Sequence, residues 1–395
     1  MRESKMAAFP LSEYKQRLDA LVSQMNKNGI DAAILTSDEM CYYFTGFNSI
    51  VWDSRTATPA VIVITKDGDM TLSTSASGVG VASYTSCVSD VRYYNRFDPK
   101  DGYESYAKAI TSILKEKKLD KGTIGLELGV GLKMHLNHMD REAMLSEIPE
   151  AKTVNIADCV WPIRKCKSPL EIEYMRKVCE INYLGIEAGL KQVKEGTTEL
   201  ELYRNIVIEY FKLGADKSMV LGVRAGKERY SQGNCPPSDR PIGKGEFILV
   251  DGGPFYKGYC SDIIRLAMIG QPTQEQREMF DIAREACYAG INVVKPGVPI
   301  SLAAQEVDKV MLRNEKYACY NMGVGGTGHS IGVNVHEYPM IGVDSTEVFE
   351  EGMIFAIEPY FLKDGVGSIG IEENVLVTKT GYEILTPSDS DLMIL

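Results

Sequence analysis

The stretch GEFILVDGGPFYKGYCSD, residues 245–262, predicts an apolar strand, a turn and a second strand, with a carboxylate on each strand. The apolar residues Phe247–Val250 lead to Asp251, and the second strand, Tyr259–Met268, carries Asp262. The intervening GPFYKG is typical of a hairpin turn. Paired antiparallel strands can bring two aspartates to one face, where a cation would offset their repulsion. Alternatively, Asp251 is a turn residue and Asp262 an exposed strand residue.

A second copy of this pattern follows later in the chain. Residues 245–251, GEFILVD, match residues 352–358, GMIFAIE, at an offset of 107 residues. Two further matches share an offset of 101 residues: 189–196 with 290–297, and 222–223 with 323–324. Three matches in one order favour a duplicated α+β half. In this register Asp251 and Glu358 are equivalent, and we expect them to face each other across a pseudo-twofold axis.

Composition excludes several classes of protein. The chain has 395 residues, of which 44% are hydrophobic and 25% charged, so we expect two globular domains rather than disorder. A net charge of −11 is unfavourable for binding nucleic acid or anionic membranes. We find neither an apolar run of the ~20 residues that a membrane span needs nor a signal-peptide core. Nine scattered cysteines without a C-x-x-C pair favour a reducing, cytoplasmic location.

The first part of the chain predicts an α/β domain. A helical period over 11–28 is followed by short β-rich runs at 32–36, 58–65 and 70–74, a helix near 103–118 and a strand at 123–128. Ser168-Pro169-Leu170-Glu171 then forms a complete capping box that opens a long helix. We place an N-terminal domain at 1–160 and a catalytic domain at 161–395.

Three further side chains complete a candidate site. His329 lies in the glycine-dense segment GTGHSIG, which permits close backbone approach, although a lone histidine there is more often structural. Glu358 ends one apolar strand and Glu372 begins another. With Asp251 and Asp262 they make four carboxylates and one imidazole, an arrangement that needs compensating cations. Two divalent ions satisfy it, and this donor set suits Mn²⁺, Fe²⁺, Co²⁺ or Zn²⁺.

At this point the sequence resembles the prolidase, aminopeptidase P and creatinase family. The resemblance rests on five motifs: LVDGGPFYKGYCSD (249–262), GTGHSIGVNVHEYP (326–339), FAIEP (355–359), IGIEENVLVT (369–378) and, in the first domain, LTSDEMCYYFTGF (35–47). It implies an α/β N-terminal domain of the creatinase type and an α+β pita-bread catalytic domain with an internal pseudo-twofold repeat.

The resemblance also implies roles for individual residues. The metal ligands would be Asp251, Asp262, His329, Glu358 and Glu372. Glu358 would also move the proton from a metal-bridging water, which becomes the attacking hydroxide, to the leaving amine. His336 would contact the substrate or the tetrahedral intermediate; alternatively it is an exposed loop histidine. The implied activity is that of a metal-dependent hydrolase resembling Xaa-Pro dipeptidases and aminopeptidases. In creatinase-type relatives one subunit's N-terminal domain covers the other's active site, so the resemblance implies a homodimer with Phe47–Ser54 as a candidate lid.

Three positions depart from the family pattern, and all concern substrate handling. Asn234 stands where prolidases and creatinase carry a substrate-contacting histidine, Gly325 where many prolidases have another histidine, and Gly370 where many have an arginine. A second hypothesis is therefore a small-molecule hydrolase or lyase on the same scaffold, like creatinase, ectoine hydrolase or a dimethylsulfoniopropionate lyase. A third is a binding module without activity, which the retention of all five ligands disfavours.

Overall fold

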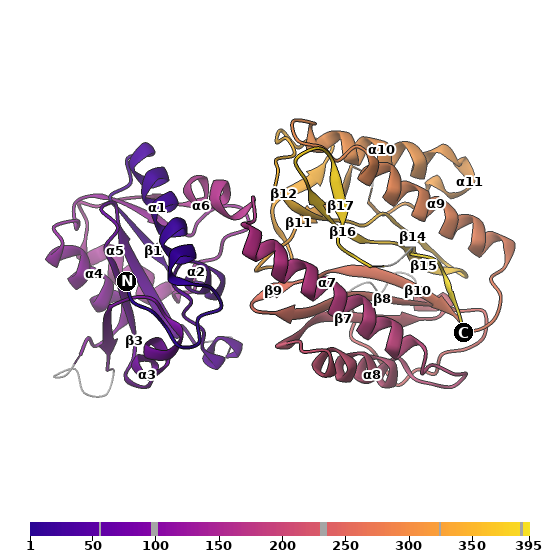
Figure 1. Ribbon diagram of the computed structural model, residues 1–395, viewed down its shortest axis with the longest axis horizontal. Helices are drawn as coiled ribbons and strands as arrows, with labels where there is room; N and C mark the ends of the chain where they lie inside the picture. The colour runs from indigo at the N-terminus through magenta and orange to yellow at the C-terminus, as the bar shows by residue number, and fades with distance from the viewer. Residues whose placement is uncertain (55–56, 96–101, 230–234, 324, 388–389) are drawn as a thin grey trace. The chain divides into compact units, whose positions relative to one another are not determined.

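The computed structural model describes residues 1–54, 57–95, 102–229, 235–323, 325–387 and 390–395. The described chain divides into two compact units, Met1–Arg164 and Lys165–Leu395 (Figure 1). Each has its own sheet system and buried core.

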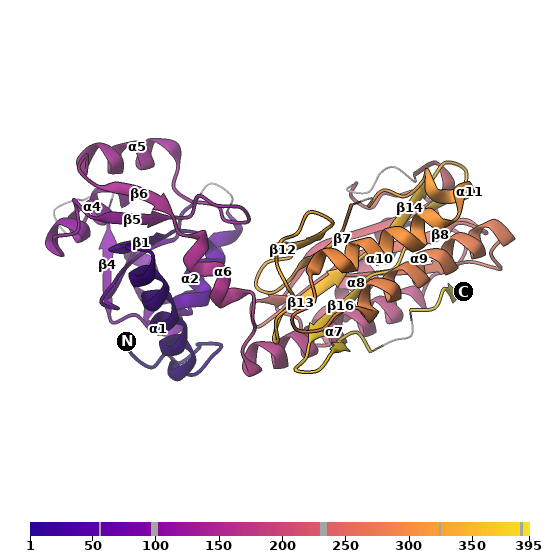
Figure 2. The ribbon, with the colours of Figure 1, turned by 90° about the horizontal axis from the view of Figure 1, so that it is seen from above.

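The first unit is an α/β domain, as predicted. Its elements are α1 (Leu11–Lys27), β1 (Ala32–Leu35), α2 (Asp38–Thr45), η1 (Ile50–Asp53), β2 (Ala60–Thr65), β3 (Met70–Ser75), α3 (Ala76–Thr85), β4 (Asp90–Tyr94), α4 (Tyr106–Glu116), β5 (Thr123–Leu126), α5 (His138–Glu147), β6 (Lys152–Asn155) and α6 (Ala157–Arg164). Six strands form one mixed sheet in the order β4-β3-β2-β1-β5-β6, with helices on both faces (Figures 1 and 2). The central strands β1 and β2 are buried throughout because both faces are covered.

The second unit encloses its strands between two pairs of helices. Its elements are α7 (Pro169–Leu190), α8 (Glu199–Lys212), β7 (Lys217–Ala225), η3 (Lys227–Arg229), β8 (Phe247–Tyr256), β9 (Tyr259–Cys260), β10 (Ile263–Met268), α9 (Gln274–Asn292), α10 (Ile300–Arg313), α11 (Glu315–Ala318), β11 (Gly326–Ser330), β12 (Glu337–Gly342), β13 (Ile354–Ile357), β14 (Tyr360–Lys363), β15 (Gly367–Gly370), β16 (Glu373–Val377), β17 (Tyr382–Ile384) and β18 (Met393–Ile394). The sheets run β18-β10-β8-β7, with β9 beside β8, and β12-β11-β13-β16-β17, with β14 and β15 as a separate ribbon. Helices α7 and α8 pack on the first sheet, and α9 and α10 lie on the opposite outer side (Figure 1).

The two halves of this unit repeat each other, as the sequence predicts. Each half supplies two helices and then an antiparallel sheet. A side-chain carbon added at Gly189 in α7 would lie 2.4 Å from Ile206 in α8. One added at Gly290 in α9 would lie 2.8 Å from Val307 in α10, and both residues are displaced by the same 101 positions (290 − 189 and 307 − 206). The two helix pairs therefore use the same glycine-mediated close approach.

This close approach predicts the effect of Gly189→Ala. Although alanine favours helix formation, its methyl group would overlap Ile206, whose backbone nitrogen lies only 3.2 Å from the added carbon. Overpacking of this kind costs about 1–3 kcal/mol. We expect the free energy of unfolding to fall by about that amount in denaturant titrations. Gly381→Ala is the control, because nothing lies within 4 Å of the added carbon there, and its stability should match that of the wild type.

Capping boxes begin three of the long helices. At α7 the Ser168 hydroxyl accepts a hydrogen bond from the Glu171 amide, and the Glu171 carboxylate accepts one from the Ser168 amide, as predicted. The helices α8 and α9 start in the same way, with Thr198 and Thr273 as caps. These reciprocal bonds satisfy amides that the first turn of a helix leaves without partners.

The hairpin after Asp251 is longer than predicted. We expected GPFYKG to form the turn, but β8 continues to Tyr256 and pairs with β9, and the turn is Lys257-Gly258. Both turn residues have positive φ, 50° and 76°, which a tight two-residue hairpin requires. Asp251 therefore lies in mid-strand opposite Ile264, with Asp262 immediately before β10.

None of the helices in the described residues could span a membrane. Each is either too short or too polar to cross a bilayer.

Candidate metal centre

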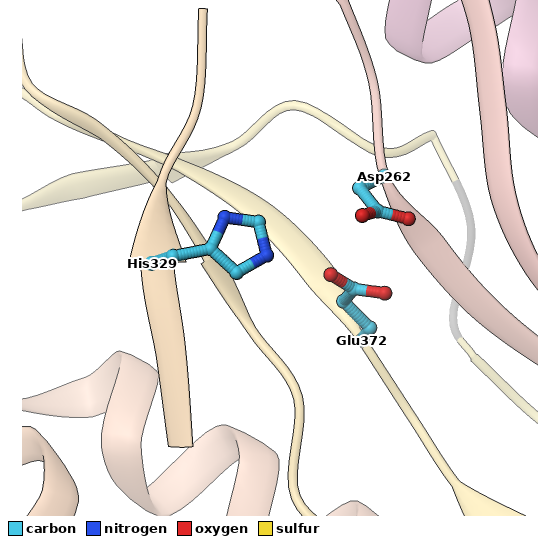
Figure 3. Close-up of side chains that lie close together, drawn as sticks. All are labelled: Asp262, His329 and Glu372. Atoms are coloured by element: carbon cyan, nitrogen blue, oxygen red, sulfur yellow. The ribbon is translucent and has the colours of Figure 1, made fainter. Parts of the chain in front are cut away.

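Two carboxylates and one imidazole lie close together in the interior of the second unit. Asp262 precedes β10, His329 lies on β11, and Glu372 precedes β16. One ligand atom from each lies within 4.8 Å of the others, and the side chains point toward one another (Figure 3). Their residues are 8%, 1% and 0% exposed, respectively. The duplicated halves place Asp262 and Glu372 at corresponding positions, each just before the return strand of its own half.

The ligand atoms of this triad have no hydrogen-bond partners. Among the described residues, Asp262 Oδ1, His329 Nε2 and both carboxylate oxygens of Glu372 are buried without one. Leaving such groups unsatisfied costs free energy for each atom. Three oxygens and one imidazole nitrogen around a common point are the donors that a divalent cation of the Mn²⁺, Fe²⁺, Co²⁺ or Zn²⁺ type accepts. The residues present therefore fit a metal ion.

The backbone prepares His329 as a ligand. Its Nδ1 lies 3.1 Å from the carbonyl oxygen of Ser330. Because a carbonyl only accepts, Nδ1 carries the proton and the Nε2 lone pair faces the carboxylates. Burial, followed by the neighbouring His336, lowers the pKa of His329 to about 4, so the ring is neutral at physiological pH.

More accessible residues form a rim around the triad. Glu358 Oε1 lies 3.5 Å from His329 Nε2, and the Glu358 side chain is 27% exposed. Asp251 on β8 is 34% exposed. The ring of His336 is exposed to solvent, yet its centroid lies 4.3 Å from that of His329. The predicted site residues that the structure describes thus lie close together, with a buried interior and a more exposed rim.

The carboxylates of the cluster retain their protons unusually strongly. Burial raises the pKa of Asp262 and of Glu372 well above the ordinary range, and neighbouring carboxylates raise both further. Burial and then Asp251 raise the pKa of Glu358 to about 8. Burial also raises the pKa of Asp251, although Arg224 opposes this effect. Binding a cation would stabilise the ionised forms and release these protons.

This electrostatic arrangement predicts that the cation-free protein loses stability between about pH 6.5 and 8.5. In the folded state Glu358 has a pKa of about 8, so its carboxyl group keeps its proton over most of this range. In the unfolded state a glutamate has a pKa near 4.5 and has already lost that proton. The folded state therefore binds more protons, and the free energy of unfolding falls as pH rises. His329 opposes this slope only in the lower part of the range, because the unfolded ring, with a pKa near 6.5, is largely neutral above about pH 7.5.

Thermal unfolding of chelator-treated protein across this range measures the effect. We expect the midpoint to fall with pH, and Mn²⁺ to raise it more at the alkaline end. Glu358→Gln is the matched control and should show a shallower decline. A midpoint that rises with pH in the wild type and in the control alike would contradict the assignment.

A hydrogen-bonded amide fixes the hairpin that carries Asp262. The side chain of Asn374, on β16, donates to the Asp262 carbonyl at 2.6 Å and accepts from the Asp262 amide at 3.2 Å. It also accepts from the Ser261 hydroxyl at 2.9 Å. Asn182 of α7 donates to Ser261 and to the Gly252 carbonyl, which connects this hairpin to the helix layer. One buried asparagine therefore positions a metal-ligand candidate from the opposite half of the unit.

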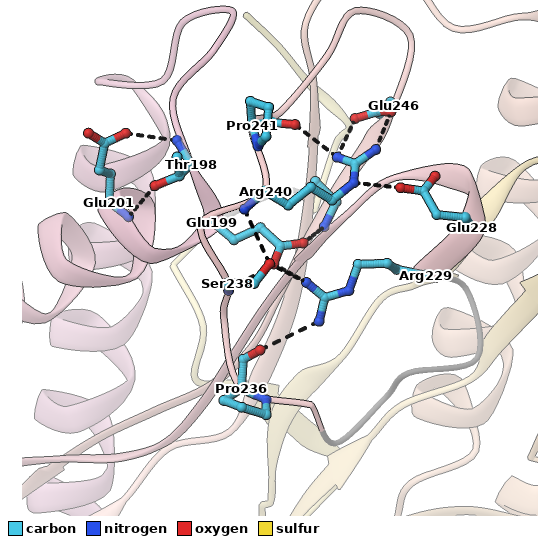
Figure 4. A network of polar contacts seen from close by, with 11 residues as sticks. Thr198, Glu199, Glu201, Glu228, Arg229, Pro236, Ser238, Arg240, Pro241 and Glu246 are labelled. Atoms are coloured by element: carbon cyan, nitrogen blue, oxygen red, sulfur yellow. Dashed lines mark hydrogen bonds and ion pairs between the residues drawn. The ribbon is translucent and has the colours of Figure 1, made fainter.

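A second polar network anchors the segment after β7 (Figure 4). Glu199, fully buried at the start of α8, accepts hydrogen bonds from the Ala225 amide and from both the amide and the hydroxyl of Ser238. It also pairs with Arg229. Arg240 forms two hydrogen bonds with Glu246 and one with Glu228. Glu199 thus ties together the two ends of the chain segment that carries Asn234, which itself lies outside the described residues.

Gly325 and Gly370, two of the positions that depart from the family pattern, fit the local backbone. Gly325 has φ of +82°, a conformation that a histidine adopts only with strain. A side-chain carbon at Gly370 would lie 2.7 Å from Cβ of Tyr360, its partner across the β14–β15 ribbon. A larger residue would therefore strain the backbone at Gly325 and clash with Tyr360 at Gly370.

Three functional candidates were missed from the sequence: Arg224, Asn374 and Glu199. Each is a buried polar residue, and Arg224 and Asn374 lie within strands whose other residues are largely apolar. A polar residue among apolar neighbours was the signal that the sequence offered for Arg224 and Asn374. It identifies a buried polar group without indicating which part of the chain it contacts.

Comparisons with known proteins agree with this geometry. Residues 173–379 match the model of metallopeptidase family M24, and residues 17–166 match that of the creatinase/prolidase N-terminal domain. Over 380 residues the chain is 29% identical to a Xaa-Pro dipeptidase of Pyrococcus furiosus, covering 96% of this chain and 100% of that protein.

Two solved structures have the same fold over nearly the full chain. A Xaa-Pro dipeptidase from Bacillus anthracis superposes with a TM-score of 0.83 at 26% identity, covering 97% of this chain and 100% of the other. An X-Pro aminopeptidase from Thermotoga maritima superposes with a TM-score of 0.81 at 25% identity, covering 96% and 99%.

The fold and the buried donor set define a metal-dependent hydrolase of the pita-bread type, with a creatinase-type N-terminal domain. Because the M24 model matches more than half of the chain, the protein belongs to metallopeptidase family M24. The predicted family, fold class and enzyme class are thereby confirmed.

Proposed function

We propose that the protein hydrolyses the amide bond of Xaa-Pro dipeptides or related small amides, using two divalent cations. The observation that carries the proposal is the buried triad of Asp262, His329 and Glu372, whose ligand atoms have no hydrogen-bond partner in the described chain. The similarity to the Xaa-Pro dipeptidases of P. furiosus and B. anthracis and to the X-Pro aminopeptidase of T. maritima supports the substrate class.

Each residue of the cluster has a distinct role in this proposal. Asp262, His329 and Glu372 hold the cations from the interior, and Asp251 and Glu358 complete the donor set at the rim. Bound cations of this kind supply an activated water nucleophile and a Lewis acid for the carbonyl. The best-suited ions are Mn²⁺, Co²⁺, Fe²⁺ and Zn²⁺.

Glu358 and His336 perform the proton transfer and charge stabilisation. Glu358 is partly exposed, and a bound cation would favour its ionised form, so it can accept the proton of the nucleophilic water and pass it to the departing amine. The amide C–N bond breaks as the water oxygen bonds to the carbonyl carbon. His336, exposed beside His329, donates to the carbonyl oxygen as negative charge develops there.

Steady-state hydrolysis by the Mn²⁺-loaded full-length protein tests the proposal. Ala-Pro and Gly-Pro should be cleaved with a kcat of about 1–10³ s⁻¹, and a chelator should abolish cleavage. Small amides, creatine-like compounds and sulfonium compounds form a second panel. No turnover of any Xaa-Pro dipeptide by protein that carries two cations would contradict the proposed substrate class.

We further propose that the protein acts as a homodimer in which Phe47–Ser54 of one subunit lies over the site of the other. Ile50 and Val51, in η1, are 90% and 46% exposed, as apolar residues of a contact segment would be in an isolated chain. Light scattering should give twice the chain mass. A monomer with full activity would contradict this proposal.

A further inference from the structure

A buried lysine joins the two ends of the loop between β11 and β12. Lys167 lies immediately before the N-cap residue of α7. Its Nζ donates to the Ser330 hydroxyl at 3.3 Å and forms an ion pair with the Glu337 carboxylate at 3.5 Å. Ser330 ends β11, Glu337 begins β12, and the two residues are cross-strand partners. Lys167 therefore fixes both ends of the loop formed by residues 331–336.

The loop is also held between its ends. Glu337 uses Oε2 for the ion pair, and its Oε1 accepts a hydrogen bond from the Asn334 amide at 3.1 Å. The Gly332 carbonyl accepts a hydrogen bond from the Cys260 amide at 2.9 Å. A side-chain carbon added at Gly332 would lie 2.9 Å from Glu337 Oε2 and 3.1 Å from Cε of Lys167. The loop backbone therefore packs directly against the ion pair.

The two histidines of the site are the chain neighbours of the residues that Lys167 contacts. His329 comes just before Ser330, and His336 comes just before Glu337. His329 belongs to a strand, and its Nδ1 lies against the Ser330 carbonyl. His336 belongs to the loop and is exposed, with its ring 4.3 Å from that of His329. The orientation of His336 therefore depends on the conformation of the loop.

The ion pair is better suited to specifying a conformation than to stabilising the fold. Removing two charges from water offsets most of their attraction, and apolar residues of similar volume often give equal stability. The lysine ammonium group has three N–H donors, and three acceptors surround it: the Lys165 carbonyl at 3.4 Å, the Ser330 hydroxyl and the Glu337 carboxylate. These contacts are directional, whereas apolar packing is not. The pair therefore favours one arrangement of the loop over others.

We propose that the Lys167–Glu337 ion pair positions His336 for catalysis by holding the 331–336 loop in the conformation that turns this ring toward His329 and the reacting carbonyl group. The inference rests on the role proposed above for His336 and adds the residues that orient it. Both side chains of the pair are 1% exposed, so neither reaches the substrate. Lys167 and Glu337 are positioning residues, and they act through His336.

Steady-state hydrolysis of Ala-Pro by the Mn²⁺-loaded full-length protein measures the effect. We expect Glu337→Gln, which keeps the volume of the side chain and removes its charge, to lower kcat by about 10- to 100-fold. The KM should change by less than about threefold and the Mn²⁺ content should stay the same. Glu13→Gln is the matched control, because Glu13 forms a buried ion pair with Arg17 in the first unit, and it should keep the wild-type kcat. A wild-type kcat in Glu337→Gln would overturn the inference.

Two double variants distinguish positioning from a purely structural role. In a His336→Ala background, Glu337→Gln should lower kcat by less than about twofold further, because no ring remains to be oriented. A full additional loss in that background would show that the pair acts through something other than His336. Replacing Lys167 and Glu337 together by methionine should preserve the thermal midpoint of unfolding and still lower kcat. Wild-type kcat in this apolar double variant would equally overturn the inference.

A measurement without turnover separates this inference from the proposed function. The chain has four histidines, so deuterated, chelator-treated protein with protonated histidine retains four ring systems for NMR. We expect a nuclear Overhauser effect between the rings of His329 and His336, whose centroids lie 4.3 Å apart, and its loss in Glu337→Gln. That result supports the inference even if no Xaa-Pro dipeptide is cleaved. Absence of the effect in the wild type, or its full retention in Glu337→Gln, overturns the inference even if dipeptides are cleaved.

Discussion

Asp262→Ala is expected to abolish cation binding and to lower kcat/KM by at least about 10³-fold. Asp262 is 8% exposed, and its Oδ1 has no partner within the described chain. Its removal leaves only His329 and Glu372 in the interior of the site, too few donors to compete with water for a divalent ion. Elemental analysis and Ala-Pro hydrolysis measure the two effects. Asp364→Ala removes an exposed carboxylate from the β14–β15 turn and should change neither.

The fold should survive this substitution. Burial and the charges of Asp251 and Glu358 raise the pKa of Asp262, so the cation-free protein holds a buried carboxyl group whose Oδ1 has no hydrogen-bond partner in the described chain, and alanine removes that cost. We expect chelator-treated Asp262→Ala to unfold at a temperature no lower than chelator-treated wild type at pH 8. Retention of activity with bound metal would show that Asp262 is not a ligand.

Glu358→Gln is expected to lower kcat by about 10²- to 10⁴-fold while part of the cation binding remains. Glutamine cannot accept a proton from water or return it to the leaving amine. The buried triad does not include Glu358, so the interior donors stay in place. Titration with Mn²⁺ and single-turnover cleavage of Ala-Pro separate the two effects. Glu351→Gln, at an exposed neighbouring carboxylate, is the control and should behave as the wild type.

The outcome for Glu358 distinguishes a proton carrier from a simple ligand. If activity returns fully when Mn²⁺ saturates the Glu358→Gln protein, the residue contributes only to metal affinity. A persistent loss of kcat at saturation assigns the proton transfer to this carboxylate, because metal loading and chemistry are then separated.

Local sequence signals predicted the parts of the fold that depend on neighbours in the chain. The Ser168–Glu171 capping box and the alternation of strands and helices each rest on contacts within a few residues, and both are confirmed. The internal repeat was detectable because Gly189 and Gly290 occupy equivalent close contacts between helices. The cluster was predictable for a related reason: each half places a carboxylate next to a corresponding strand.

Features that depend on distant contacts were not predictable in the same way. The extension of β8 to Tyr256 requires pairing with β9, and the short β14–β15 ribbon requires Gly370 to lie against Tyr360. The Asn374 side chain binds the Asp262 backbone 112 residues away along the chain. No local pattern of charge or hydropathy identifies such a partner.

Metal content tests the central claim most directly. The full-length protein is incubated with Mn²⁺, freed of excess by gel filtration and analysed for bound elements alongside the Asp262→Ala protein. Our account predicts about two divalent ions per chain in the wild type, and loss of both binding and Xaa-Pro hydrolysis in the variant. Wild-type protein that holds no divalent ion would contradict the account, because the buried carboxylates of Asp262 and Glu372 would then persist as protonated groups without ligands.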